Sequence, residues 1–253
     1  MTTAIFLSCI VVFITHTLEA VTGFGCTVLA LPFVTALLGI RTGVISLTVI
    51  AWILAAYFAI TKRKQIDFKQ YGIILICMLA GLPVGMYLFR KFDIASLKKV
   101  LAVFICIVSL WQLIGLLLIH PGKTVQSGKN TGQKLYEKTA YYLLLIIGGI
   151  VHGMFSSGGP LAVLYASKMI PDKSRFRATM CLLWTTLNTI IIIGYIVDKS
   201  FTRENCTITA IFIPFLIAGI FLGDIIHTKV NARMFSIMLF TVLLLTGIVM
   251  VIA

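Results

Sequence analysis

Long apolar stretches separated by short polar loops constrain the fold of this chain more than any other feature. A helix needs about 20 apolar residues to cross the hydrocarbon core of a membrane, and most of the 253 residues fall into segments of roughly that length. Hydrophobic residues make up 60% of the chain and charged residues 11%, whereas soluble domains are about 45–50% apolar and about 25% charged. This composition excludes a soluble enzyme and a disordered protein, and predicts a polytopic membrane protein.

The apolar segments are expected to be helices rather than the strands of a barrel. A chain in lipid must pair its backbone polar groups internally, and the run Ile190–Ile193 lacks the apolar–polar alternation of a barrel strand. The predicted fold class is an all-α polytopic membrane protein. Ten helices are expected, over residues 3–21, 26–39, 43–60, 71–89, 96–119, 140–155, 159–169, 177–197, 207–226 and 232–252.

Two of these segments are short, and each directly follows a break rich in glycine or serine. The first break is Gly23-Phe24-Gly25, and the second runs from Ser156 to Pro160. A shift of 133 residues superposes the two without a gap, placing Glu19 on His152 and Gly25 on Gly158. Short interrupted segments at matching positions of two halves are a sequence pattern of transporter binding sites.

The two breaks also suggest how the chain is organised. Residues 1–119 form the first transmembrane repeat, 120–138 a hydrophilic linker loop, and 139–253 the second repeat. Each half contains five segments, which is an odd number, so the second half enters the membrane from the opposite side. The repeat is therefore predicted to be inverted, with a short interrupted helix or hairpin in each half.

The charge balance is strongly basic, with 21 Lys and Arg against 8 Asp and Glu. On a soluble protein this would suggest nucleic acid, but here the basic residues lie between apolar stretches, so we expect no nucleic-acid partner. The loops at 61–70, 120–139, 168–177 and 227–233 hold 14 basic residues, and the other loops hold 7. The first set is predicted to be cytoplasmic, in a multi-pass protein of the cell inner (plasma) membrane.

The breaks are predicted to bind an anion. A helix that begins inside the membrane leaves its first N–H groups unpaired and carries the positive end of its dipole there, and such an end attracts anions. If two short helices start near the midplane from opposite sides of the membrane, the N-terminal ends of both point at the same region. The alternative is that these small residues only let helices pack closely. The predicted substrate-binding residues are Thr22, Gly23, Gly25, Thr27, Ser156, Ser157, Gly158, Gly159 and Asn188.

Three titratable residues near the breaks are candidates for proton coupling. Glu19 lies inside the first segment, and carboxylates in a membrane are costly and usually functional. His16 lies one turn before it, and His152 matches it across the repeat. The alternatives are a Glu19 side chain at the edge of a pore and a His152 ring that only bonds a neighbouring backbone group.

No catalytic, cofactor or metal motif is present in the sequence. There is no Gly-x-Ser-x-Gly, no His-Glu-x-x-His and no phosphate-binding loop, and the six cysteines show no Cys-x-x-Cys spacing. We therefore expect a protein that is not an enzyme and that needs neither a cofactor nor a metal.

The run Gly23-Phe24-Gly25-Cys26-Thr27 through Pro32, and the run Ser156-Ser157-Gly158-Gly159-Pro160 through Tyr165, resemble the paired small-residue motifs of the sulfite exporter TauE/SafE family, also called the toluene-sulfonate uptake permease family. Cys26 and Thr27 stand where its pattern has two further glycines. The resemblance implies a secondary transporter for small sulfur-containing or organic anions such as sulfite, sulfoacetate or other sulfonates.

The predicted function is thus secondary active transport of a small anion by alternating access, with proton coupling through Glu19 or His152 as a hypothesis. Three alternatives remain at this point. One is an anion-selective channel, another is a carrier for a different solute with cation coupling, and the third is an accessory membrane subunit without transport. The expected partners are the anionic substrate and the lipid bilayer, and a homodimer is a possible assembly.

Overall fold

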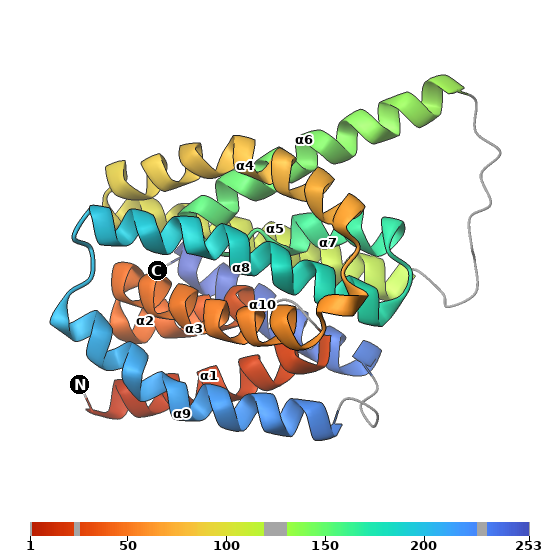
Figure 1. Cartoon of the computed structure of the whole chain (residues 1–253). Coiled ribbons are helices and arrows are strands. Elements are labelled where there is room, and N and C mark those ends of the chain that lie inside the picture. The colour runs from red at the N-terminus through yellow and green to blue at the C-terminus, as the bar shows by residue number, and fades with distance from the viewer. Residues whose placement is uncertain (1, 23–25, 119–130, 227–231, 253) are drawn as a thin grey trace.

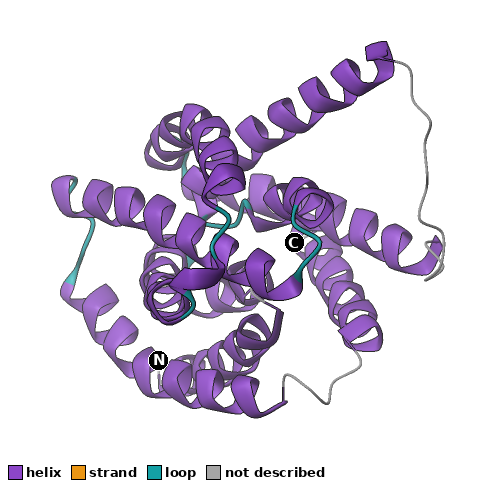
Figure 2. Cartoon of the chain, turned by 45° about the vertical axis from the view of Figure 1, so that its right-hand side comes forward, coloured by secondary structure: helices purple, strands orange, loops and turns teal. Residues whose placement is uncertain are grey.

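The computed structural model describes residues 2–22, 26–118, 131–226 and 232–252. Within these ranges the chain is helical and contains no strand (Figure 2), so the all-α prediction is confirmed. A 3-10 turn, η1 (Arg63–Gln65), joins the third and fourth helices. The α-helices are α1 (Thr2–Thr22), α2 (Cys26–Leu38), α3 (Ile40–Thr61), α4 (Phe68–Lys91), α5 (Ile94–Leu118), α6 (Thr131–Phe155), α7 (Gly159–Met169), α8 (Lys173–Val197), α9 (Arg203–Ile226) and α10 (Ala232–Ile252).

The described helices follow the ten predicted segments in order, and they differ in length as the sequence suggests. Six of them, α1, α3, α4, α5, α8 and α9, are long and apolar enough to cross a membrane. The two helices that follow the breaks are short, with 13 residues in α2 and 11 in α7. The chain is therefore a multi-pass helical protein with one short helix in the corresponding place of each half.

Several helices begin a few residues before the predicted position, among them α8 at Lys173 and α9 at Arg203, and the largest difference is at α6. Helix α6 begins at Thr131, so residues 131–138, which the sequence assigned to the linker, are helical. The boundary was predicted from the start of the apolar stretch. A helix does not have to end where its apolar residues end, because polar residues can continue it outside the hydrocarbon core. In Figure 1, α6 accordingly extends beyond the other helices.

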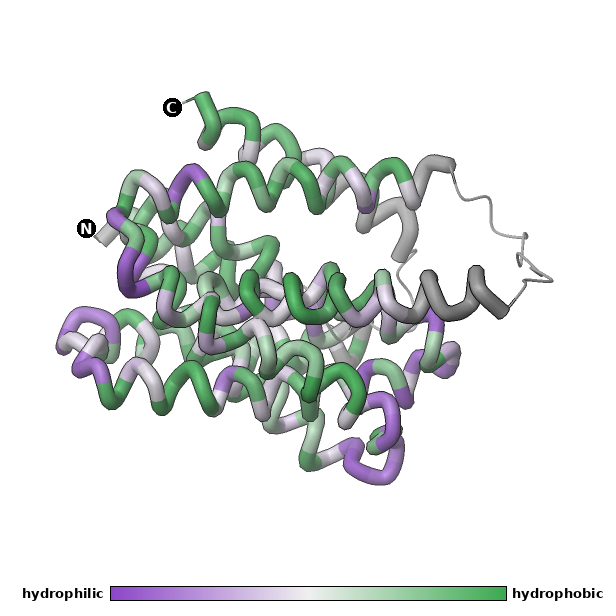
Figure 3. The backbone as a smooth tube through the Cα atoms, turned by 90° about the horizontal axis from the view of Figure 1, so that it is seen from above, coloured by the Kyte–Doolittle hydropathy of each residue, from purple (hydrophilic) through white to green (hydrophobic). Residues whose placement is uncertain are grey.

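The helices run roughly side by side, with their connections at two ends. Figure 1 shows η1 and the α7–α8 connection at one end, and the α4–α5 and α8–α9 connections together with both termini at the other. Most hydrophilic segments lie toward these two ends, with largely hydrophobic helices between them (Figure 3). Between the ends, large side chains such as Ile76, Ile107 and Phe221 are exposed by 71%, 58% and 67%. Surfaces of this kind suit contact with lipid.

Close approach of backbones holds the helix pairs together. Helix α4 packs on α6, α1 on α9, α5 on α10 and α3 on α8. At the α4–α6 contact, a Cβ added to Gly81 or Gly85 would collide with the carbonyl oxygen of Ile146 or Ile150, and Gly149 and Gly153 meet α4 in the same way. Small residues four apart on each helix allow this approach in a membrane, where no hydrophobic driving force holds helices together.

Helices α4 and α8 are also tied to each other at both ends. Asp67 caps α4 by accepting a hydrogen bond from the backbone N–H of Gln70, and its carboxylate lies 3.3 Å from the guanidinium of Arg175 on α8. At the other end, the guanidinium of Arg90 on α4 lies 2.6 Å from the carboxylate of Asp198 at the end of α8. These partly exposed contacts link both ends of α8, the helix that carries one side of the site described next, to α4.

Candidate functional site

The start of α7 lies in the protein interior and is held by a tight turn. Ser156 adopts a left-handed conformation with φ of 51°, which is uncommon for a residue other than glycine. Its backbone N–H donates to the carbonyl of His152, which ends α6. A Cβ on Gly158 would meet the backbone of Gly148 and lie 2.8 Å from the Cβ of His152. The turn therefore has to carry glycine where it packs against α6.

His152 anchors this turn to α8. The backbone N–H of Gly158 donates to Nδ1 of His152 at 3.4 Å, and Nε2 lies 3.0 Å from Oδ1 of Asn188. Because a backbone N–H can only donate, Nδ1 must be the acceptor and Nε2 must carry the proton. The imidazole also stacks on the ring of Trp184, with centroids 5.2 Å apart. His152 is thus a neutral ring whose two nitrogens both have hydrogen-bond partners.

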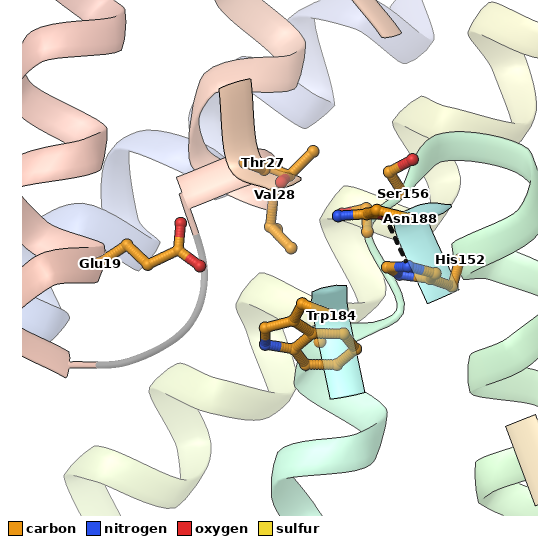
Figure 4. Close-up of a pocket in the computed structure, with 10 residues that line it drawn as sticks. Glu19, Thr27, Val28, His152, Ser156, Trp184 and Asn188 are labelled. Carbon is orange, nitrogen blue, oxygen red and sulfur yellow. Dashed lines mark hydrogen bonds between the residues drawn. The ribbon is translucent and has the colours of Figure 1, made fainter. Parts of the chain in front are cut away.

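This arrangement fixes the orientation of the Asn188 amide. Its oxygen accepts from His152, so its NH₂ group points the other way, toward Thr27 and Val28 at the start of α2 (Figure 4). Asn188 is 2% exposed. A buried amide held in this way presents N–H donors to whatever occupies the space in front of it.

The two serines of the break have different surroundings. The hydroxyls of Ser156 and Thr48 lie 2.6 Å apart, which ties the break to α3. Ser157 is equally buried, but its hydroxyl has no hydrogen-bond partner among the described residues. A buried hydroxyl without a partner costs free energy on the order of 1–3 kcal/mol. Ser157 therefore marks a place where a bound group would restore a hydrogen bond.

A cavity lies where the starts of α2 and α7 face each other. It contains about 320 Å³ of empty space, including the part that is open to its surroundings. Figure 4 shows Glu19 on one side and Ser156, Asn188 and His152 on the other, with Val28 and Trp184 between them. The lining residues are Glu19, Thr27, Val28, Ala51, His152, Ser156, Ser157, Gly159, Trp184 and Asn188.

The polar groups of this cavity favour an anion. Thr27 and Val28 lie in the first turn of α2, and Gly159 is the first residue of α7, so the N-terminal ends of two helices line one space. Such ends supply N–H donors and a partial positive charge. Hydroxyl and amide donors stand beside them, and Glu19, which is 4% exposed, is the one carboxylate in the lining.

The structure brings together most of the predicted site residues that it describes. Thr27, Ser156, Ser157, Gly159 and Asn188 line the cavity with Glu19 and His152. Gly158 is not part of the lining, but its backbone N–H contacts His152. His16 does not line it. Its Nδ1 lies 2.8 Å from the carbonyl oxygen of Val12 on its own helix. Gly23, Gly25 and the side chain of Thr22 lie outside the described residues.

Four residues that surround the site were not among those predicted. Val28 and Ala51 line the cavity, Trp184 forms one of its walls, and Thr48 supports Ser156 from α3. Val28 and Ala51 carry no chemical signal in the sequence, and Thr48 is one of many threonines. Trp184 lies one helical turn before Asn188 on α8, and that spacing of four residues is the only signal that could have indicated it.

Metal coordination is not suggested by the described part of the chain, where no three His, Cys, Asp or Glu side chains are placed to hold an ion. The donors that surround the cavity are N–H and O–H groups, which suit an oxyanion better than a cation.

A comparison with protein families agrees with these observations. The sequence model of the family described as "Sulfite exporter TauE/SafE" matches residues 8–250 of this chain. The chain has no match among curated proteins or among solved structures. The family match extends over both breaks and at least part of each of the ten described α-helices, and the family is one of membrane transporters rather than enzymes. This multi-pass membrane protein therefore belongs to the sulfite exporter TauE/SafE family.

Proposed function

We propose that this protein is a secondary active transporter that moves a small sulfur-containing or organic anion, such as sulfite or a sulfonate, across the cell inner membrane. The observation that carries the proposal is the single cavity that the starts of α2 and α7 both line. Family membership supports transport of sulfite-like anions in general. The cavity supports a binding site in the interior of the helix bundle, where a carrier needs it.

The proposed ligand is an oxyanion with a short or no organic group. Its oxygens would accept hydrogen bonds from the Ser157 hydroxyl, the Asn188 amide and the first N–H groups of the two helices. The Asn188 amide is held by His152 before the ligand arrives, which lowers the entropy cost of binding.

Alternating access through an inverted repeat is the proposed mechanism. If each helix of the first half is exchanged with the helix five places later, the α4–α6 contact becomes the α9–α1 contact. The α3–α8 and α5–α10 contacts map onto themselves, and the structure contains all of these pairs. This pattern supports a two-fold relation between the halves, around which the cavity would open alternately to either side.

Glu19 is the proposed site of proton coupling. Its carboxylate lines the same cavity as the donors, so an ionised Glu19 would repel an incoming anion. Protonation of Glu19 would remove that repulsion, and the anion and the proton would then bind and move together. His152 is a weaker candidate for this role, because Gly158 and Asn188 occupy both of its ring nitrogens. In this proposal His152 positions Asn188.

Counterflow in proteoliposomes tests the proposed function. Vesicles are loaded with unlabelled sulfite, an organic sulfonate, sulfate or a carboxylate, and labelled sulfite is supplied outside. We expect transient accumulation when sulfite or a sulfonate is inside. Folded protein that shows no accumulation with any of these anions would contradict the proposal.

The same vesicles separate a carrier from an anion channel built on the same helix ends. A carrier saturates and shows counterflow, because each cycle returns with a bound anion. A channel conducts without counterflow and gives a current that increases with the electrochemical gradient. If a conductance is measured and counterflow is not, the protein is an anion channel and not a carrier.

A further inference from the structure

The described residues include two buried charges of opposite sign. Among the residues whose burial is known, Glu19 and Arg177 are the only buried Asp, Glu, Lys or Arg, with exposures of 4% and 8%. Arg177 lies on α8, one helical turn before Cys181, and Glu19 lies on α1. Arg177 does not line the cavity itself.

Burial distinguishes Arg177 from an arginine that only fixes membrane topology. Arg175, two residues earlier, has a side chain that is 56% exposed and pairs with Asp67 near the end of the bundle. Arg177 instead places its guanidinium 3.7 Å from the centre of the Phe58 ring on α3. A topology anchor extends its charge into water, whereas Arg177 keeps its charge inside the protein, where ionisable residues are costly and usually functional.

Helix α8 connects Arg177 with the cavity along one face. Arg177, Cys181, Trp184 and Asn188 follow each other at spacings of four, three and four residues, and all four are buried. Residues at such spacings lie on the same side of a helix. At 1.5 Å per residue, Arg177 lies about 10 Å along the axis from Trp184 and about 16 Å from Asn188, toward the end that carries the α7–α8 connection.

The chemistry of this position suits a second anion. A guanidinium that stacks on an aromatic ring uses its face, while its N–H groups lie in its plane and can hold an oxyanion through two parallel hydrogen bonds. A positive charge in a narrow, weakly polar surrounding also concentrates anions from solution.

We propose that Arg177 forms a second anion-binding station on the route between the central cavity and the side of the membrane that carries the α7–α8 connection. This inference rests on the proposed function. The anion would bind first at the Arg177 guanidinium, then move along the Cys181–Trp184 face of α8 and reach the donors around Asn188. The station and the central cavity would hold the same oxyanion in turn.

The test compares Arg177→Gln, Arg177→Lys and the exposed control Arg175→Gln in proteoliposomes of known orientation, with labelled sulfite supplied to one side at a time. We expect Arg177→Gln to raise the half-saturating concentration about tenfold or more, with the larger increase on the α7–α8 side. Arg177→Lys keeps the positive charge but loses the planar guanidinium, and should raise the half-saturating concentration by about threefold. Arg175→Gln should stay within about twofold.

The side-specific readout separates an anion station from a merely structural arginine, since loss of structure would affect both sides equally. Protection of the detergent-solubilised protein from thermal unfolding by sulfite gives a second readout that does not need transport. If the wild-type protein binds sulfite but shows no counterflow, the proposed transport function is contradicted. The station is then tested by comparing the sulfite affinities of wild type and the Arg177 variants. Equal affinities for wild type and folded Arg177→Gln would overturn the station. If Arg177→Gln does not fold, wild-type affinity in Arg177→Lys would overturn it instead.

Discussion

The two breaks occupy matching positions in the two halves, but they contribute different chemistry to the site. In the second half, Ser156 bonds Thr48, and His152 holds both Gly158 and Asn188, so a network fixes the donors before any ligand arrives. In the first half, the described contribution is Glu19 with the first turn of α2. The comparison suggests a division of labour, with a rigid donor framework from one half and a titratable group from the other.

This division has a physical reason. An anion site needs donors at fixed positions, because mobile donors would lose entropy when the ligand binds. A coupling residue needs the opposite, since it must change its charge during the cycle. Two sets of groups placed in one cavity by different helices can meet both demands without compromise. The predictions below test the framework and the titratable group separately, starting with the largest expected effect.

The largest effect should come from Gly158→Ala. The added methyl group would collide with the Gly148 carbonyl and lie 2.8 Å from the Cβ of His152, so α7 could not keep its place on α6. Overpacking of this kind costs about 1–3 kcal/mol, occasionally more, and we expect loss of counterflow together with a lower melting temperature. Gly159→Ala is the matched control for the melting temperature only, because its methyl group would find only Trp184, at 3.8 Å, whereas Gly159 itself lines the cavity. If the two variants have the same melting temperature, close packing at Gly158 does not fix this break.

Glu19→Gln should abolish coupling while leaving the framework intact. Glutamine has nearly the same shape as glutamate but cannot take up a proton in this range, so we expect uptake to stop responding to a pH gradient while sulfite exchange continues. The measurement is labelled uptake with and without an imposed gradient. His152→Gln tests the alternative carrier of the proton. An unchanged pH response in Glu19→Gln, or its loss only in the His152 variant, would contradict the assignment.

Asn188→Asp reverses the character of one donor with little change in shape. An aspartate oxygen can still accept from Nε2 of His152, as Asn188 does at 3.0 Å, but the N–H donors that face the cavity are replaced by an oxygen. We expect sulfite affinity to fall by about tenfold or more, and the melting temperature of the empty protein to fall as well, because a buried carboxylate is costly. Thermal protection by sulfite measures both quantities at once. Wild-type affinity in this variant would mean that Asn188 does not face the ligand.

Ser157→Ala should give the smallest effect. Its hydroxyl has no hydrogen-bond partner among the described residues, so its removal should not destabilise the empty protein. Loss of one hydrogen bond to the bound anion should weaken binding by about threefold to tenfold. Ser156→Ala should instead lower the melting temperature, since it breaks the contact with Thr48. If Ser156→Ala weakens binding and Ser157→Ala lowers the melting temperature, Ser156 is the residue that binds the anion and Ser157 the one that holds the turn.

Much of this fold could be predicted from the sequence, because lipid leaves an apolar chain few choices. Helix length is set by the membrane and polar breaks are rare, so ten segments and two matching interruptions can be recognised from hydrophobicity and glycine alone. The start of α6 at Thr131 was missed, because hydrophobicity reports where a segment enters lipid and not where its helix begins. The inverted relation of the two halves remains a prediction, supported by the helix pairs.

The site could be predicted only in part. Residues within the breaks were found because Gly and Ser stand out in apolar sequence, and Asn188 because it is polar in the middle of a segment. Trp184 and Thr48 reach the site through the packing of α8 and α3, which the sequence does not specify. Arg177 lies in the basic loop at 168–177, which was used only to predict sidedness from the sequence. Its exposure of 8% shows that it is buried, unlike a residue of a solvated loop.

The central claim is that both halves contribute to one anion site, and equilibrium binding of labelled sulfite tests it most directly. The variants are Thr27→Val from the first half, Ser157→Ala from the second, and the double variant. We predict one bound anion per chain, weaker binding in each single variant, and still weaker binding at the same single site in the double variant. A stoichiometry of two independent sites, or an affinity that depends on only one of the two halves, would contradict the claim.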